Sequence, residues 1–289
     1  MKKYSSFDKS STQRVSYILN TKNRAEFLEQ TLKMCRTLIK NQDELIIIDG
    51  ASEDNTPEVV KKYADIIDIF LSEPDLTSAH AFNKGLLLAK GRYIKHLADD
   101  DIVLPQALEK AILVMEKNPE IDLLVCGGTV SIAGAKSKKI VYVPPGSNYG
   151  HNIYDIFDYG ACGMGYIIRR DALSKIGLFP AFDWLADASF LINCIQAKAT
   201  VKFCRINLFH AMTYPHSTGT REAKGWDQDK FNLVKNYAPK SFFWRYRINR
   251  YLWQHPKYKF FFIFPLTFLK ILKRITETRK KYVWDGGFS

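Results

Sequence analysis

The chain has 289 residues, of which 46% are hydrophobic and 25% charged, an ordinary globular composition that excludes a low-complexity protein. Its net charge of +12 is concentrated between Phe242 and Trp284, where eleven Lys and Arg face one acid, Glu277, so an anionic partner is expected for this extension only. No apolar run reaches the roughly 18 residues of a transmembrane helix, and residues 1–14 lack the apolar stretch of a secretory signal.

Buried strands alternate with helices along the first part of the chain. Apolar runs without a polar–apolar alternation predict strands that are covered on both faces, at 15–19, 45–48, 66–71 and 93–98. Helical spacing of apolar residues predicts helices between them, one that includes 27–35 and others at 56–63 and 78–90. This alternation predicts a parallel α/β sheet with helices on both faces.

The pattern changes after Leu104. The spacing predicts helices at 105–117, 171–176 and 185–197, a strand at 121–126 and an alternating segment at 137–143. The segment 160–168 mixes glycine with β-forming residues, and we expect it to cross the sheet antiparallel to the other strands.

Each predicted strand of the first half is followed by polar residues. These are Thr21, Asp49, Asp75 and the run Asp99–Asp101. Ligands of parallel α/β sheets bind beyond the carboxyl ends of the strands. The four polar strand ends therefore predict one site, at one edge of the sheet.

Three consecutive carboxylates, Asp99, Asp100 and Asp101, are the most informative part of this edge. Adjacent carboxylates repel one another unless a cation compensates their charge or one of them holds a proton. Hard divalent cations such as Mg²⁺ bind oxygen ligands of this kind. The alternative is a solvated turn, in which Asp101 caps the helix that begins at Pro105.

These segments together resemble glycosyltransferase family 2, the inverting nucleotide-sugar transferases of the GT-A fold. The motifs that carry the resemblance keep the family's order and spacing across residues 15–204. They are VSYILNTKNR (15–24), IIIDGASEDNT (46–56), SEPD (72–75) with AFNKG (81–85) and AKG (89–91), and the aspartate triplet in place of the family's D-x-D metal motif. The resemblance implies a catalytic domain at 15–222, with a nucleotide-sugar-binding half (15–104) and an acceptor half (105–222), between an N-terminal tail (1–14) and a basic aromatic helical extension (223–289).

The resemblance also implies roles for the residues that match. It implies that Asp100 and Asp101 hold a Mn²⁺ or Mg²⁺ ion that bridges both donor phosphates, with Asp99 facing the ribose or replacing one ligand if the register is shifted by one. The side chains expected to contact the nucleotide-sugar are Thr21, Asn23, Arg24, Asp49, Asp75, Asn83, Lys84 and Asp99. Structural alternatives remain, since Thr21 and Asn23 are also turn formers and Lys84 also suits a solvated helix.

Inversion requires a general base that removes the proton of the acceptor hydroxyl. In the family this base is an Asp at a helix start, and Asp187 in WLADASF (184–190) resembles it, with Asp183 as a neighbouring candidate. The alternative for Asp187 is a carboxylate stabilised only by the helix dipole. His210 and His216 are candidates for an approach to the metal or diphosphate, and the alternative for each is a structural role, which is more common for a single histidine.

Three positions depart from the family pattern. Ala98 replaces the first acid of the usual D-x-D-D, His80 replaces an Asp, and Thr77 replaces a Gly. These changes affect the expected donor sugar or base more than the expected class of reaction.

The extension mixes apolar and basic residues. On a helical wheel Phe264, Phe268, Ile271, Leu272 and Ile275 share one side, as in a helix that lies in an anionic membrane interface. The apolar side could instead pack on the body or on a second subunit. Nucleic-acid binding by the same residues would leave the acidic edge unexplained, so no nucleic-acid partner is expected.

The sequence therefore predicts a metal-dependent inverting glycosyltransferase of cell-surface polysaccharide synthesis. Its expected donor is a nucleotide-diphospho-sugar, namely a UDP-sugar, and its expected acceptor a glycan or lipid-linked glycan. The scattered cysteines fit reduced thiols, so we expect a cytoplasmic protein at the inner face of the cell membrane. A nucleotidyltransferase that makes a sugar nucleotide is the alternative, but its usual Gly-rich loop has no counterpart at 20–24, which contains no glycine.

Overall fold

The computed structural model describes residues 14–100, 102–132, 140–142, 161–180, 185–213, 223–238 and 240–254. The chain divides into two compact units, residues 1–237 and 238–289. Helix α9 (Ala223–Tyr237) belongs to the first unit, whereas the boundary expected from the sequence fell before it, after residue 222. The roles assigned to the two halves of the catalytic domain stay predictions.

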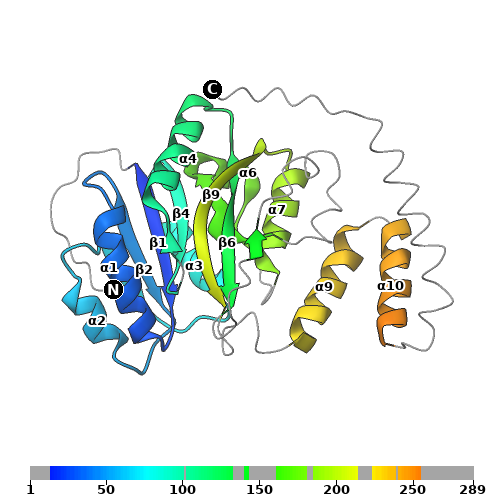
Figure 1. The fold of residues 1–289 in the computed structure, drawn as a ribbon, viewed down its shortest axis with the longest axis horizontal. Helices are drawn as coiled ribbons and strands as arrows, with labels where there is room; N and C mark the ends of the chain where they lie inside the picture. Colours follow the sequence, from blue (N-terminus) through cyan, green and yellow to red (C-terminus); the bar gives the residue numbers. More distant parts are fainter. Residues whose placement is uncertain are drawn as a thin grey trace. The chain divides into compact units, whose positions relative to one another are not determined.

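A nine-stranded mixed sheet flanked by helices forms the first unit (Figure 1). The strand order is β3-β2-β1-β4-β8-β6-β9-β5, and β7 pairs with β6. The strands are β1 (Val15–Thr21), β2 (Glu44–Asp49), β3 (Ile69–Ser72), β4 (Tyr93–Ala98), β5 (Ile102–Val103), β6 (Leu123–Ile132), β7 (Ile140–Tyr142), β8 (Tyr166–Arg169) and β9 (Val201–Thr213). The predicted α/β class is confirmed.

The helices match the spacing of apolar residues closely. They are α1 (Ala25–Leu38), α2 (Thr56–Lys62), α3 (Ser78–Leu88), α4 (Pro105–Lys117), α6 (Leu173–Ile176), α7 (Ala186–Gln196), α9 and α10 (Lys240–Gln254), with 3-10 turns η1 (Gly163–Gly165) and η2 (Arg170–Ala172). The N-cap position of α4 is Leu104, whose side chain forms no capping hydrogen bond. Asp101 lies outside the described residues, so its alternative role as a cap stays a prediction. None of the helices in the described ranges is long and apolar enough to cross a membrane.

The first four strands form the parallel half of the sheet, in the order β3, β2, β1, β4. Every residue of β2 is buried, which explains its unbroken apolar run. β3 begins at Ile69, later than predicted, because Ala64 and Ile66 donate backbone hydrogen bonds in turns that follow α2. The glycine of the AFNKG motif, Gly85, lets α3 approach β1, since a Cβ there would overlap Ile18.

The second half of the sheet is mixed. β8 runs antiparallel to both β4 and β6, as predicted for this segment. β9 was not predicted, although it is the longest strand, and it pairs parallel with β6 and antiparallel with β5. The register of β6 and β9 shifts on both sides of Gly127, which disrupts the two-residue period by which a strand is recognised in a sequence.

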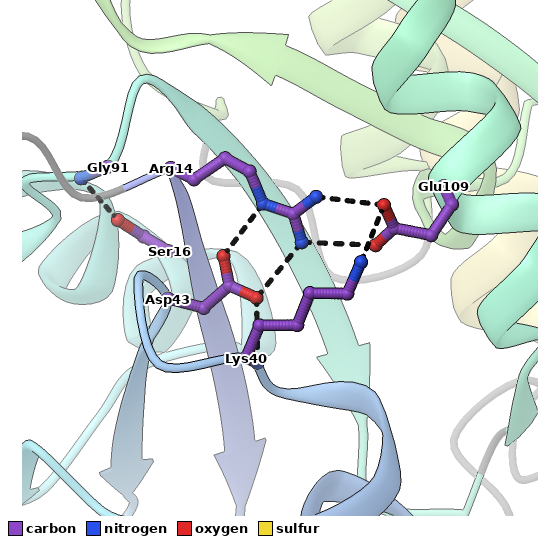
Figure 2. Close-up of polar contacts among 6 residues, drawn as sticks. All are labelled: Arg14, Ser16, Lys40, Asp43, Gly91 and Glu109. Atoms are coloured by element: carbon purple, nitrogen blue, oxygen red, sulfur yellow. Dashed lines mark hydrogen bonds and ion pairs between the residues drawn. The ribbon is translucent and has the colours of Figure 1, made fainter.

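A partly buried ion-pair network lies at the amino ends of β1 and β2 (Figure 2). The predicted site lies at the opposite, carboxyl ends of these strands. The Arg14 guanidinium donates to Asp43 over 3.1 Å through two nitrogens, and to the two Glu109 oxygens over 2.9 and 3.0 Å. Lys40 Nζ lies 2.9 Å from Glu109 on α4. Through Arg14, this network joins Asp43, next to the start of β2, to Glu109 of α4. Because Asp43 is fully buried, its carboxylate depends on these contacts, and the network stabilises the folded protein.

We predict that Arg14→Met destabilises the protein by about 3–5 kcal/mol, because the buried Asp43 carboxylate loses its guanidinium partner. Urea unfolding of the purified variant measures the loss. Arg36→Met is the matched control, since Arg36 forms a similar two-pronged pair with Asp65 in which both side chains are about half exposed. Equal losses in the two variants would show that the Arg14 network contributes no more than a surface pair.

Candidate active site

The carboxyl ends of β1, β2 and β4 meet at one edge of the sheet. The register pairs Thr21 with Asp49 and Asn20 with Ala98, so the residues that follow β4 lie beside the end of β1. The predicted polar edge therefore exists for Thr21, Asp49, Asp99 and Asp100. Asp101 lies outside the described residues.

Asp99 is the most buried carboxylate of the triplet that the structure describes, with 5% of its surface exposed. Thr21 Oγ1 donates to its Oδ2 over 3.0 Å, and Thr31 Oγ1 donates to its backbone oxygen over 2.8 Å. Burial raises the pKa of Asp99 to about 7, with the Arg24 charge acting in the opposite direction and Asp100 adding to the rise. The Asp99 carboxyl therefore takes up a proton at a higher pH than an ordinary aspartate does, mainly because it is buried.

Arg24 neutralises the carboxylates. Its guanidinium lies 3.4 Å from Asp99 Oδ1 and 2.6 Å from Asp100 Oδ2, and it stacks over the Phe27 ring at 4.5 Å. The sequence placed Arg24 beside the donor but did not predict this pairing. Carboxylate oxygens are suitable ligands for a divalent metal, and of the two predicted ligands the structure describes only Asp100. Its role as a metal ligand stays a prediction. Outside residue 101 and the other undescribed segments, no group of three or more His, Cys, Asp or Glu is arranged to hold a metal.

Asp49 is fully buried, and its carboxylate accepts hydrogen bonds from two neighbouring serines. Ser52 donates through its backbone N–H over 3.2 Å and its hydroxyl over 2.5 Å, and the Ser72 hydroxyl donates over 2.6 Å. The partner that a buried carboxylate needs is thus supplied by the protein. Its contact with a nucleoside stays a prediction.

Asn23 shapes the loop that follows β1. It has a positive φ of 52°, its Oδ1 accepts from the Glu53 N–H over 2.7 Å, and its own N–H donates to Ser52 over 2.7 Å. Asp54 accepts from the Ala25 N–H at the start of α1 over 3.0 Å. These bonds join the loops after β1 and β2, which favours the structural role for Asn23.

Lys84 holds the loop that carries Asp75. Its Nζ donates to the Pro74 oxygen over 2.8 Å and pairs with Glu73 over 3.0 Å. With 12% of its side chain exposed, Lys84 is not a solvated helix residue, so that alternative is wrong. The Asp75 carboxylate lies against Gly50, where a Cβ would be 2.5 Å from Asp75 Oδ2, so Asp75 also lies at the edge next to Asp49.

Asn83 links the two halves of the first unit. Its side chain donates to the Phe179 oxygen and accepts from the Phe179 N–H, both over 2.9 Å. The Phe179 ring stacks on Phe190 of α7, with centroids 3.9 Å apart and planes 6° apart. Asn83 therefore positions α7, a role that the sequence did not indicate.

Asp187 lies in the first turn of α7 and is held by η1. Gly163 N–H donates to Asp187 Oδ2 over 2.7 Å, and Tyr166 Oη donates to the Asp187 backbone oxygen over 2.9 Å. A Cβ at Gly163 would lie 2.7 Å from Asp187 Oδ1, so only glycine allows this approach. Because β8 runs antiparallel to β4, the η1 turn that precedes β8 lies toward the carboxyl end of β4, the edge that carries Asp99.

Lys95 supports this arrangement from inside the sheet. It is fully buried in β4, and its Nζ donates to the Met164 oxygen over 2.7 Å. Burial raises the pKa of Asp187, while the Gly163 N–H and the Lys95 charge act to lower it. A partly desolvated carboxylate of this kind suits a general base. The only sequence signal for Lys95 was a charged residue inside an apolar run.

The remaining candidates are less central. His210 lies on β9 opposite Ile102 and forms a 2.7 Å hydrogen bond with Thr129. A hydrogen-bonded position on a strand favours a structural role for His210, although its approach to a metal stays a prediction. Asp183 and His216 lie outside the described residues.

Solved structures share this architecture at low sequence identity. The Staphylococcus aureus protein TarS, solved in complex with UDP-GlcNAc, has a TM-score of 0.58 and 16% identity over 78% of this chain and 65% of its own. A mannosyltransferase of Pyrobaculum calidifontis, solved with GDP-Man and Mn²⁺, has a TM-score of 0.53 and 16% identity over 81% of this chain and 64% of its own. The fold is therefore the GT-A fold of nucleotide-sugar transferases.

The sequence comparison identifies the family. The family model described as Glycosyl transferase family 2 matches residues 16–177, and this chain belongs to that family. A relative from Rickettsia typhi, described as an uncharacterized glycosyltransferase, is 27% identical over 171 residues, which are 57% of this chain and 53% of the relative. That alignment thus spans about half the length of the relative.

Proposed function

We propose that this chain is a metal-dependent inverting glycosyltransferase that uses a nucleotide-diphospho-sugar as donor. The observation that carries the proposal is the pair Asp99 and Asp100, which share the Arg24 guanidinium at the edge of the sheet that also holds Asp49. Family membership supports glycosyl transfer as the reaction.

The proposed reaction uses carboxylates at two places, the aspartate triplet for the metal and Asp187 for the acceptor proton. Asp100, together with Asp101 or Asp99, would hold a Mn²⁺ or Mg²⁺ ion, which when bound absorbs the charge that develops on the diphosphate. Arg24 adds a second positive charge beside the same carboxylates. Asp187 takes the acceptor proton while the acceptor oxygen bonds to the anomeric carbon and the bond from that carbon to the diphosphate oxygen breaks.

A UDP-sugar is the proposed donor, and a glycan or lipid-linked glycan in cell-surface polysaccharide synthesis the proposed acceptor. The structural neighbours support a nucleotide-sugar, since TarS was solved with UDP-GlcNAc and the Pyrobaculum enzyme with GDP-Man. We further propose a cytoplasmic protein that binds the inner face of the membrane through its basic extension, because of the eleven Lys and Arg between Phe242 and Trp284.

The purified chain should bind at least one nucleotide-sugar in the presence of Mn²⁺ and none of them when Mn²⁺ is replaced by a chelator. Calorimetric titration with UDP-glucose, UDP-GlcNAc, UDP-galactose and GDP-mannose, each with and without Mn²⁺, measures this. Release of pyrophosphate from UTP and a sugar phosphate would favour the nucleotidyltransferase instead. If no nucleotide-sugar binds under either condition, the proposed function is wrong.

A further inference from the structure

Helix α10 carries a surface that the proposed catalytic site does not use. Among the α10 residues whose side chains the structure describes, the exposed ones are Lys240, Trp244, Arg247, Ile248 and Tyr251. Trp244 and Tyr251 are each 55% exposed and Ile248 is 46% exposed. At 3.6 residues per turn these five positions fall within about 100° of the helix circumference, so they form a single surface, the α10 face.

The chemistry of the α10 face is that of a membrane–water interface. Trp and Tyr have an apolar ring with a polar tip, and they are enriched at the level of lipid headgroups. The Arg247 guanidinium lies 4.8 Å from the centroid of the Trp244 ring, so a cation accompanies the apolar surface. Long basic side chains can lie along such a surface while their charge reaches the phosphates.

Charge selects an anionic partner for this face. The sequence of α10 contains no acid, and residues 255–284 add eight Lys and Arg against Glu277. Trp, Tyr and Arg are also enriched at protein interfaces, so the composition of the face does not separate the two kinds of partner. The absence of any acid from the α10 sequence, together with the basic residues that follow it, favours an anionic lipid surface. A helix of 15 residues is about 22 Å long, too short to cross the roughly 30 Å bilayer core, so it would lie in the plane of the interface.

We propose that the α10 face binds the surface of an anionic lipid bilayer, with Trp244, Ile248 and Tyr251 in the interface and Lys240 and Arg247 at the headgroup phosphates. This inference rests on the proposed membrane association of the extension, and it assigns the contact to one helix face. The exposed apolar side chains supply affinity, and the basic side chains supply the preference for anionic lipid.

Sedimentation of the full chain with vesicles tests the proposal. The chain should bind vesicles of phosphatidylcholine mixed with phosphatidylglycerol more tightly than vesicles of phosphatidylcholine alone, and less tightly when NaCl is raised from about 0.1 M to about 1 M. The triple variant Trp244→Ala, Ile248→Ala, Tyr251→Ala should lose at least about ten-fold in affinity. Alanine keeps the helix, which far-UV circular dichroism verifies. The control variant Leu87→Ala, Leu113→Ala removes two exposed leucines of α3 and α4 and should bind like the parent chain.

Lys240→Glu with Arg247→Glu should remove the preference for anionic vesicles.

Parent-like vesicle binding by the triple variant would overturn the inference while leaving membrane association and catalysis standing. Absence of vesicle binding by the parent chain would overturn both the inference and the proposed membrane association. A variant that loses poly(U) binding or self-association, but not vesicle binding, would also overturn it, in favour of RNA or a second copy. Nucleotide-sugar binding with Mn²⁺ should be unchanged in every α10 variant, which separates this test from that of the proposed reaction.

Discussion

Asp187→Asn should lower the rate of sugar transfer by about 10²–10⁴-fold and leave the affinity for the donor nearly unchanged. Asn keeps an oxygen that can accept the Gly163 N–H, now 2.7 Å from Asp187 Oδ2, so the helix start keeps its contact. It cannot take the acceptor proton, which is the step that the carboxylate is proposed to perform. Transfer kinetics and donor titration on the same preparation separate the two effects.

The raised pKa of Asp187 also predicts the direction in which the transfer rate changes with pH. Burial raises the pKa of Asp187, and a base acts only when deprotonated, so transfer should rise with pH through a pKa above the ordinary aspartate value of about 3.9. Asp171→Asn is the control, since the Asp171 side chain is 81% exposed. The hydrogen bonds and ion pairs described for Asp171 do not reach η1 or α7. Lost donor binding in Asp187→Asn would instead assign this residue to the donor site.

Asp100→Asn should weaken Mn²⁺-dependent donor binding by about 100-fold or more, because a bound metal contributes several kcal/mol to the stabilisation of a charged diphosphate. The asparagine amide has no charge to attract the Mn²⁺ ion, and it also lacks the 2.6 Å ion pair that Asp100 forms with Arg24. Titration of the donor with and without Mn²⁺ measures the effect.

Asp65→Asn provides the control, since it also removes an aspartate charge that pairs with an arginine, but on the surface of the protein. A melting temperature close to that of the parent chain in the absence of metal would exclude unfolding as the cause of weaker binding. If donor binding keeps its full dependence on Mn²⁺, then Asp100 is not a ligand, and the metal is held by Asp99 and Asp101.

Local patterns predicted most of the first half of the fold. α4 begins and ends at the predicted residues, and β1, β2 and β4 include every residue predicted for them. Buried strands and amphipathic helices can be recognised in a sequence because the spacing of their apolar residues is a short-range pattern. β9 was missed because its pairing with β6 is irregular and because Leu208 and Phe209 are the only buried residues among its described side chains. A strand of this kind is defined by its partner rather than by its own alternation.

The sequence by itself determined the order of the elements and the carboxylates at the strand ends, because residue type and spacing are local properties. Only the tertiary structure decided what those side chains contact. It turned Arg24 from a residue expected beside the donor into the counter-ion of Asp99 and Asp100, and Asn83 into the link between α3 and the segment packed on α7. It also brought Lys95 of β4, the η1 turn that contains Gly163, and Asp187 of α7 together. Such contacts join residues far apart in the chain, so the physical reason for each role lies in packing and burial that no local pattern encodes.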